Sequence, residues 1–367
     1  MKFPRFFTNS CCAALLALAT ALPAVSQAQT KLRFQSTFPA KGTFADGGRL
    51  WAERVNALSG GRLVIEMLAP GSVVPAFESL EAVHKKVLDG AHSASAYWVG
   101  KNRAAALFGP TPGGPFGMDE IDYMGWIYEA GGLDLYRELY QVELKMNVVS
   151  FPMTAVGHQA MGWFKTPVLN WADLKGRKCR QTGITAEVFS KSGMATVNMP
   201  GGEILAAGER GVINCAEWVG AGDDSIVGFD TIWKHFYPQS VHEPASVVEI
   251  IINGDVWKAL APDLQAIIQS ASIEATLRSM NQRNRADALA LSEMPKKGVT
   301  VHRTPDDILK KVLESWDEIS KEEAAKNPFF KKVLDSQRTW AGQVVPTRRT
   351  TTPPYNYSAN HYWPEKK

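Results

Sequence analysis

The chain contains 367 residues, of which 45% are hydrophobic and 21% are charged. These values are ordinary for a globular protein, and the length suits two domains of common size. The formal net charge is +3, and removal of Lys2 and Arg5 with the first 28 residues would leave +1. The chain therefore lacks the basic excess that indicates a nucleic-acid partner.

Residues 1–28 have the features of a signal peptide. Two basic residues precede the apolar stretch Cys11 to Ala24, which contains no acidic residue, and Ser26-Gln27-Ala28 supplies a small-x-small cleavage site. A membrane-spanning helix needs about 20 apolar residues, so this stretch is too short for an anchor. We predict that export removes residues 1–28 and places the mature chain outside the cytoplasm.

Cys179 and Cys215 are the cysteines that remain after this cleavage. Disulfides persist in exported proteins. A disulfide would tie together the segments that end in Arg180 and Glu217, provided that the two segments are neighbouring strands. Two buried free thiols are the alternative, and the sequence leaves both open. A zinc site is not indicated, because no pair of histidines lies nearby.

The first third of the mature chain alternates strands with helices. The hydrophobic periodicity predicts strands over 32–37, 63–68 and 91–98, and helices over 43–58 and 76–88. This βαβαβ order is typical of one half of a doubly wound α/β sheet. A loop rich in Gly and Pro follows, and then a helix over 119–140.

A second alternation begins further along the chain. We predict strands over 148–153, 159–164, 178–181, 196–199 and 212–218, with short helices between the last three. The apolar segment 247–252 is typical of a buried strand that returns to the first lobe. The sequence therefore predicts an α/β protein of two lobes joined by a hinge, in the form of a clamshell.

Long helices complete the predicted architecture. One begins at Pro262 and continues to about residue 294, and another follows Thr304, which we expect to be its N-cap. The predicted division is a first lobe over 29–157 and 243–285, a second lobe over 158–242 and 286–330, and a C-terminal helix with an extended tail over 331–367.

Two strand ends carry the candidate binding residues. Arg180 ends one predicted strand, and Glu217-Trp218 ends another, each before a glycine-containing loop. Open α/β sheets present ligand-binding groups at such positions. A guanidinium grips a carboxylate with two parallel hydrogen bonds, so these residues predict a site for a small organic anion. A plain surface charge is the alternative for Arg180.

Several motifs spread over nearly the whole mature chain carry a family resemblance. They are Ser59-Gly60-Gly61-Arg62-Leu63, Gly90 to Trp98 (GAHSASAYW), Pro115-Phe116-Gly117-Met118, Gly131-Gly132-Leu133, Gln159 with Gly162-Trp163-Phe164, Met199-Pro200 and Glu217-Trp218. With these motifs the chain resembles the periplasmic solute-binding proteins of tripartite ATP-independent (TRAP) transporters, a DctP-type family, and in particular their α-keto-acid-binding branch. The resemblance implies the Venus-flytrap architecture of periplasmic binding proteins, in which two α/β lobes close over one organic acid in the periplasm. Arg180 would bind the carboxylate of that acid.

The resemblance also implies a bound cation that bridges substrate and protein. Its ligands in this chain would be Gln159, Glu217, the backbone carbonyl of Trp218, and Glu243. The surrounding Val241-His242-Glu243-Pro244 departs from the aromatic, glycine-rich version typical of the branch. The keto-acid branch suggests sodium. Charge balance suggests calcium, because two Glu, one Arg and a monoanionic substrate sum to −2; oxygen ligands suit both ions.

Aromatic residues complete the predicted pocket. Tyr97, Trp98 and Trp218 lie at predicted strand ends and are expected to contact the substrate, with Tyr97 as a hydrogen-bond donor. Gln159 is expected to contact the substrate as well as the cation. Phe116 and Trp163 are more typical of core packing. His158 and His242 flank proposed ligands and are expected to have structural roles.

The predicted function is a receptor for a small 2-oxo or 2-hydroxy monocarboxylate such as pyruvate, which it delivers to the membrane permease subunits of a TRAP transporter. The resemblance also implies a homodimer formed through a C-terminal helix. A secreted hydrolase that uses Glu217 and Glu243 as a carboxylate pair is one alternative. The chain contains no Gly-x-Ser-x-Gly, His-Glu-x-x-His or phosphate-loop motif, so we predict no enzymatic activity. A ligand sensor that partners a membrane receptor is the other alternative.

Overall fold

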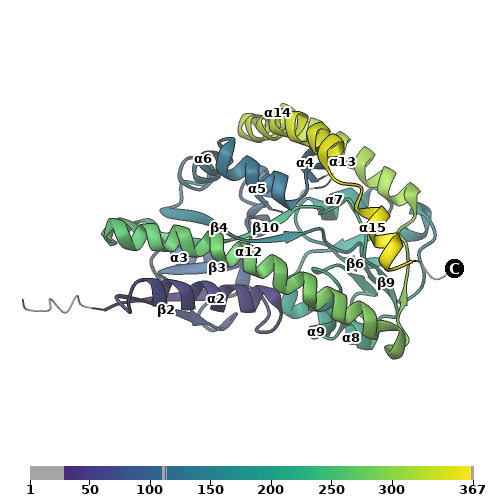
Figure 1. The fold of residues 1–367 in the computed structure, drawn as a ribbon, viewed down its shortest axis with the longest axis horizontal. Helices are drawn as coiled ribbons and strands as arrows, with labels where there is room; N and C mark the ends of the chain where they lie inside the picture. Colours follow the sequence, from purple (N-terminus) through teal and green to yellow (C-terminus); the bar gives the residue numbers. More distant parts are fainter. Residues whose placement is uncertain (1–28, 110–111, 113, 365–367) are drawn as a thin grey trace, which may run out of the picture.

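The computed structural model describes residues 29–109, 112 and 114–364, and the predicted signal peptide lies outside these residues. The chain forms two β-sheets flanked by helices (Figure 1). No helix in the described part of the chain is long and apolar enough to cross a membrane. The two-lobed α/β architecture predicted from the sequence is confirmed.

The first sheet, within the described residues, has the strand order β2-β1-β3-β10-β4. Its strands are β1 (Thr30–Ser36), β2 (Leu63–Leu68), β3 (Gly90–Ser93), β4 (Val148–Gly157) and β10 (Ser246–Asn253). β1 pairs in parallel with β2 and β3, whereas β10 is antiparallel to both β3 and β4. Every residue of β10 is buried, as expected for an apolar strand covered on both faces.

The second sheet has the strand order β11-β9-β5-β8-β6-β7 over the same described ranges. Its strands are short: β5 (Gly162–Phe164), β6 (Lys178–Arg180), β7 (Ala195–Val197), β8 (Cys215–Ala216), β9 (His235–Tyr237) and β11 (Thr300–Val301). β6 and β8 are parallel, with Cys179 opposite Cys215 and Arg180 opposite Ala216. The two candidate binding segments are therefore neighbours.

Cys179 and Cys215 form a disulfide, with their Cα atoms 4.5 Å apart. Both residues are buried, at 1% and 0% exposure. This bond settles the choice that the sequence left open between a disulfide and free thiols. It joins the two strands one residue before Arg180 and two residues before Glu217.

The chain passes between the sheets after β4, after β9 and along α12 (Pro262–Glu293). This helix begins with proline in its first turn, where a missing N–H is tolerated. It packs on α2 (Thr43–Leu58) beside the first sheet and on α9 (Ala221–Ile226) beside the second. Figure 1 shows α12 running along the molecule past both sheets. The lobe boundaries that we predict at 157/158 and 242/243 fall in the segments between β4 and β5 and between β9 and β10.

The C-terminal segment is helical. It forms α13 (Asp306–Lys326), α14 (Pro328–Thr351) and α15 (Tyr355–Tyr362), so the prediction of an extended tail is wrong. The Thr304 hydroxyl donates a hydrogen bond to the carbonyl of Gln239 and does not cap α13, because Pro305 occupies the N-cap position. α13 and α14 pack against each other on the side of the molecule away from α12 (Figure 1).

The remaining helices are short and connect the strands. They are η1 (Ala76–Glu78), α3 (Ser79–His84), η2 (Ser95–Trp98), η3 (Arg103–Phe108), α4 (Gly114–Gly117), α5 (Glu120–Glu129), α6 (Gly132–Glu138), η4 (Leu139–Glu143), η5 (Trp171–Leu174), α7 (Thr185–Ser190), η6 (Gly201–Glu203), α8 (Ile204–Glu209), α10 (Phe229–Ile232), α11 (Gly254–Ala259) and η7 (Met294–Lys297).

Several predicted elements differ from the structure, and three of them are informative. The strand predicted over 91–98 ends at Ser93, and the 3-10 turn η2 replaces its second half. The helix predicted over 119–140 is interrupted where Gly131 adopts a φ of 80°, a conformation that glycine tolerates best. The strand predicted over 212–218 is reduced to Cys215–Ala216.

Candidate functional site

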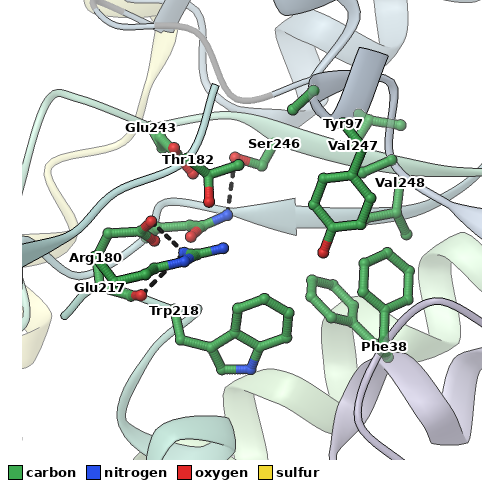
Figure 2. A pocket seen from close by; sticks show the side chains of 14 residues that line it. Phe38, Tyr97, Arg180, Thr182, Glu217, Trp218, Glu243, Ser246, Val247 and Val248 are labelled. Atoms are coloured by element: carbon green, nitrogen blue, oxygen red, sulfur yellow. Dashed lines mark hydrogen bonds and ion pairs between the residues drawn. The ribbon is translucent and has the colours of Figure 1, made fainter. Parts of the chain in front are cut away.

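A small cavity lies between the two sheets. Its volume is about 40 Å³, enough for roughly three water-sized groups. The lining residues come from both lobes and are Phe38, Phe44, Ala94, Ala96, Tyr97, Gln159, Arg180, Thr182, Glu217, Trp218, Glu243, Ser246, Val247 and Val248. Figure 2 shows a polar side of the cavity around Arg180 and an apolar side around Phe38. The arrangement suits a small molecule with one anionic end and a short carbon chain.

Arg180 provides the positive charge of the cavity. It lies at the end of β6 and is only 1% exposed. Its Nε donates to the carbonyl of Met199 at 3.2 Å, and its Nη1 donates to the carbonyl of Glu217 at 3.0 Å and contacts the Glu217 carboxylate. The guanidinium also lies over the ring of Trp218, 5.4 Å from its centroid. These contacts hold the guanidinium in one orientation, with its outer edge toward the cavity (Figure 2).

Two buried carboxylates accompany this guanidinium. Glu217 and Glu243 are each 1% exposed. Burial raises the pKa of Glu217, and burial together with the nearby Glu217 charge raises the pKa of Glu243 well above its usual value. The Thr185 hydroxyl donates to Glu243 Oε1 at 3.2 Å. Because one Arg faces two acids, both carboxylates can be ionised together only if a bound cation balances the second negative charge.

Gln159 adds a free oxygen to this cluster. Its Nε2 donates to the Ser246 hydroxyl at 3.3 Å, and its backbone N–H donates to the carbonyl of Glu243 at 2.8 Å. Its Oε1 is buried and has no hydrogen-bond partner among the described residues. A buried acceptor without a donor is unusual. Together with the two carboxylates, this oxygen fits the donor set of a hard cation.

His242 lies beside the acids, although the sequence predicts only a structural role for it. Ligand atoms of Glu217, His242 and Glu243 all lie within 4.8 Å of one another. The ring Nδ1 is 2.5 Å from the Ser240 hydroxyl, whereas Nε2 is buried without a partner among the described residues. Burial, and then the Arg180 charge, lower the pKa of His242 to about 3. The neutral ring is the form expected in the ligand-free protein.

Aromatic rings form the opposite wall. Trp218 packs edge-on against Phe44 at 5.7 Å and lies 6.3 Å from Phe38. Gly201 permits this position, because a Cβ there would lie 2.3 Å from the Trp218 ring. The Tyr97 hydroxyl points into the cavity (Figure 2) and has no hydrogen-bond partner among the described residues. Burial raises the pKa of Tyr97 to about 12, so its hydroxyl remains a donor at neutral pH.

Trp98 does not line the cavity. Its Nε1 donates to the Tyr140 hydroxyl at 2.9 Å, and the Tyr140 hydroxyl in turn contacts the buried carboxylate of Glu249. The turn η2 directs Tyr97 toward the cavity and its neighbour Trp98 into the core. The expected contact between Trp98 and the substrate is therefore not part of the site in this structure.

Three other side chains considered from the sequence also lie outside the cavity. Trp163 donates to Asp224 at 2.8 Å and is fully buried, and Phe116 packs under Arg338, so both lie outside the cavity. His158 is also absent from the lining, and only its backbone carbonyl contacts Arg283. The cavity brings together six of the predicted site residues: Tyr97, Gln159, Arg180, Glu217, Trp218 and Glu243.

Sequence reasoning missed several lining residues. Phe38 follows β1, so the strand-end argument that selected Arg180 also applies to it. Val247 and Val248 lie on the return strand β10, and only the pairing of β10 with β3 and β4 brings them to the cavity. No local pattern marks such a position.

Comparison with known proteins gives the family. A family model described as bacterial extracellular solute-binding protein, family 7, matches residues 34–327. The chain belongs to this family. Its members are solute-binding proteins of TRAP transporters and not enzymes, which excludes the hydrolase alternative. The family resemblance predicted from the sequence is confirmed.

Three relatives of this solute-binding protein are informative. A monocarboxylate 2-oxoacid-binding periplasmic protein of Nostoc sp. is 30% identical over 359 residues, which cover 95% of this chain and 97% of the relative. A TRAP solute-binding protein from Bordetella bronchiseptica has a TM-score of 0.85 and 27% identity, covering 92% of this chain and 98% of that one. Its structure is a dimer of mixed occupancy, with copurified calcium and picolinate in one active site and with an apo site.

The third relative contains a smaller ligand. A TRAP periplasmic solute-binding protein from Pseudoalteromonas atlantica, with bound sodium and pyruvate, has a TM-score of 0.83 and 29% identity. The match covers 90% of this chain and 99% of that one. The solved relatives thus contain small carboxylates together with either sodium or calcium.

Proposed function

We propose that this protein is a periplasmic receptor that binds a small 2-oxo or 2-hydroxy monocarboxylate, such as pyruvate, and delivers it to the permease subunits of a TRAP transporter. The observation that carries the proposal is the buried Arg180 guanidinium in a cavity of about 40 Å³. The pyruvate and 2-oxoacid ligands of the relatives support the same substrate class.

In this proposal each wall of the cavity recognises one part of the substrate. The outer edge of the Arg180 guanidinium binds the carboxylate with charge-assisted hydrogen bonds. The Tyr97 hydroxyl, which has no hydrogen-bond partner among the described residues, donates to a substrate oxygen. Phe38, Trp218 and Val248 surround the short carbon chain. The small volume disfavours sugars and long acids, whereas the single guanidinium disfavours dicarboxylates.

We further propose a bridging cation held by Gln159, Glu217, the carbonyl of Trp218, and Glu243. The unpartnered Gln159 oxygen and the excess of buried acid over base support it. When bound, the cation supplies the positive charge that allows a substrate anion to approach two carboxylates. Sodium is the proposed ion, after the pyruvate-bound relative, and calcium is the alternative, because it would neutralise the net charge of −2.

Calorimetry of pyruvate binding tests both parts of this proposal. Protein treated with chelator and exchanged into sodium-free buffer should bind pyruvate weakly, and one of the two ions should restore affinity. Because substrate and cation each supply charge that the other needs, their binding should be cooperative. Equal affinity in every buffer would contradict the bridging cation but would leave the Arg180 site intact.

The Glu217→Gln variant examines the cation ligand directly. Glutamine keeps an oxygen for coordination but removes one negative charge, so cation-dependent pyruvate affinity should fall. The loss should be larger with calcium than with sodium, since calcium carries twice the charge. Glu203→Gln, on the exposed turn η6, is a control that should leave pyruvate affinity unchanged with either ion.

The last part of the proposal concerns the protein partners. Closure of the lobes around the substrate would create the surface that the permease recognises. The alternative partner is a membrane sensor, which would recognise the same closed form.

We also propose a homodimer. It is supported by the dimeric Bordetella relative and by the exposed aromatic residues of the C-terminal segment: Tyr355, Tyr357, Tyr362 and Trp363. Light scattering coupled to gel filtration should give twice the mass of the mature chain, and deletion of residues 353–367 should reduce it.

A further inference from the structure

We propose that His242 is an additional, nitrogen ligand of the cation site, which enables this receptor to bind a divalent first-row transition-metal ion as well as sodium or calcium. The inference rests on the proposed cation site and names a ligand that the oxygen-only set does not contain. The structural basis is the juxtaposition of the buried His242 ring with the carboxylates of Glu217 and Glu243.

The spacing of the three side chains suits coordination. One ring nitrogen of His242 and one oxygen from each acid lie within 4.8 Å of one another. A transition-metal ion binds such ligands at about 2.0–2.2 Å, so two ligands of one ion lie up to about 4.4 Å apart. Small side-chain movements would therefore bring all three ligand atoms within bonding distance of one ion. Their exposures of 0%, 1% and 1% mean that solvent does not compete for these atoms.

The hydrogen bonds of the ring match those of a metal-binding histidine. The Ser240 hydroxyl lies 2.5 Å from Nδ1 and also accepts the backbone N–H of His242 at 3.2 Å. Histidine ligands generally donate one ring N–H to such a partner, which leaves the other nitrogen for the metal. Nε2 of His242 has no partner among the described residues although it is fully buried.

Packing alone does not account for this free nitrogen. The ring meets Phe189 of α7 edge-on at 5.6 Å, and an apolar side chain would fill that space without leaving a buried polar atom unsatisfied. Thr185 of the same helix donates to the Glu243 carboxylate, so α7 supports both the ring and the acid. The helix thereby holds the two groups beside each other.

The donor set determines the class of ion. Carboxylate and amide oxygens alone favour sodium, calcium or magnesium, whereas an imidazole adds affinity for cobalt, nickel or zinc. One imidazole, two carboxylates and one amide oxygen therefore form a mixed nitrogen and oxygen donor set. This set would bind Co²⁺ or Zn²⁺ more tightly than Ca²⁺.

The test uses the metals alone with the mature, cation-free protein. Zn²⁺ should bind at one tight site, and X-ray absorption of the one-to-one complex should show one imidazole among oxygen ligands. Co²⁺ titrated by its visible absorption should bind at least about tenfold more weakly to His242→Gln than to the parent, while Ca²⁺ affinity changes less than about twofold. His361→Gln, on the exposed helix α15, is the matched control and should equal the parent.

Two further measurements keep the result interpretable. Ser240→Ala retains the ring and removes its hydrogen-bond partner, so it should weaken Co²⁺ binding about tenfold even if His242→Gln does not fold. An absorption spectrum of the parent complex without imidazole, or equal Co²⁺ affinity in the parent and in the folded His242 and Ser240 variants, would overturn the inference. Pyruvate titrations with Ca²⁺ separate the two proposals. If cation-dependent pyruvate binding is present while these metal tests fail, His242 is not a ligand and the proposed function stands.

Discussion

Arg180 donates a hydrogen bond of 3.0 Å from Nη1 to the backbone carbonyl of Glu217, 37 residues further along the chain, and contacts the carboxylate of the same residue. This double contact lies at the ends of the paired strands β6 and β8. It fixes the guanidinium before any substrate arrives. The orientation of Arg180, and not only its charge, is therefore part of the binding site.

The first prediction concerns this orientation. Arg180→Lys keeps the positive charge but loses the planar fork that reaches the Glu217 carbonyl and the substrate together. Pyruvate binding should weaken by about 1.5–3 kcal/mol, roughly 10- to 150-fold in Kd. Calorimetry measures the change. Arg278→Lys, a half-exposed Arg of α12, should bind like the parent, and unchanged affinity in Arg180→Lys would remove this residue from the site.

The second prediction concerns the Tyr97 hydroxyl. Because it has no partner in the described structure, its removal in Tyr97→Phe should leave the melting temperature unchanged or slightly higher. Pyruvate affinity should nevertheless fall by about 1 kcal/mol, roughly fivefold, if the hydroxyl binds substrate.

A matched control for this variant is Tyr123→Phe. The Tyr123 hydroxyl donates to the carbonyl of Leu107 at 2.7 Å in the core. Its loss should lower the melting temperature and leave pyruvate affinity unchanged. The opposite pattern in the two variants would show that Tyr97 serves stability and not binding.

The third prediction concerns the disulfide. Cys179 and Cys215 are 36 residues apart, and a cross-link of this length stabilises the folded state by about 3–4 kcal/mol in the chain-entropy description. The double variant Cys179→Ala, Cys215→Ala should therefore unfold at lower urea concentration. It should also bind pyruvate more weakly, because the bond joins the strands that present Arg180 and Glu217. Lower stability with unchanged affinity would mean that the bond does not position these side chains.

The fourth prediction concerns pH. Burial raises the pKa of Glu249 from its ordinary value of 4.5 to about 7. Between these values the folded state retains a proton that the unfolded chain has released, so stability falls as the pH rises from 4.5 to 7. The expected contribution is about 3 kcal/mol. Because burial also raises the pKa of other acids, among them Asp224, the contribution is measured by urea unfolding of the parent and of a Glu249 variant at pH 5 and pH 8.

Glu249→Gln should remove this dependence while keeping an oxygen beside the Tyr140 hydroxyl. The stability of the variant relative to the parent should therefore increase from pH 5 to pH 8. If parent and variant respond to pH identically, the Glu249 carboxyl does not titrate in this range in the folded protein.

Some of the fold follows directly from local sequence. The helix over 43–58 and the strand over 63–68 are predicted with the bounds that the structure has. Between them Gly60 and Gly61 adopt φ values of 62° and 79°, which other residues rarely adopt, so the stop signal is local. Arg180 and Glu217 were likewise found from a local pattern, the ends of apolar strands.

Other features depend on contacts that no local pattern records. Periodicity extends the third strand to residue 98, but the strand ends at Ser93 and a 3-10 turn follows. As a result Tyr97 lines the cavity, whereas Trp98, which is also expected to contact the substrate, is buried in the core. The position of His242 depends on Ser240 and on α7, which the fold brings beside it. The composition of the tail predicts an extended segment, yet Pro346 lies within α14 and the chain remains helical on both sides of it.

Selection of a ligand from a mixture tests the central claim most directly. Ligand-free protein, prepared by unfolding and refolding, is incubated with equal amounts of 2-oxo monocarboxylates, dicarboxylates, amino acids and sugars in the presence of sodium and calcium. After desalting, mass spectrometry identifies what the protein retains. The account predicts one short 2-oxo monocarboxylate per chain, retained by the parent and lost from Arg180→Lys. Retention of a sugar, an amino acid or a dicarboxylate, or equal retention by both proteins, would contradict it.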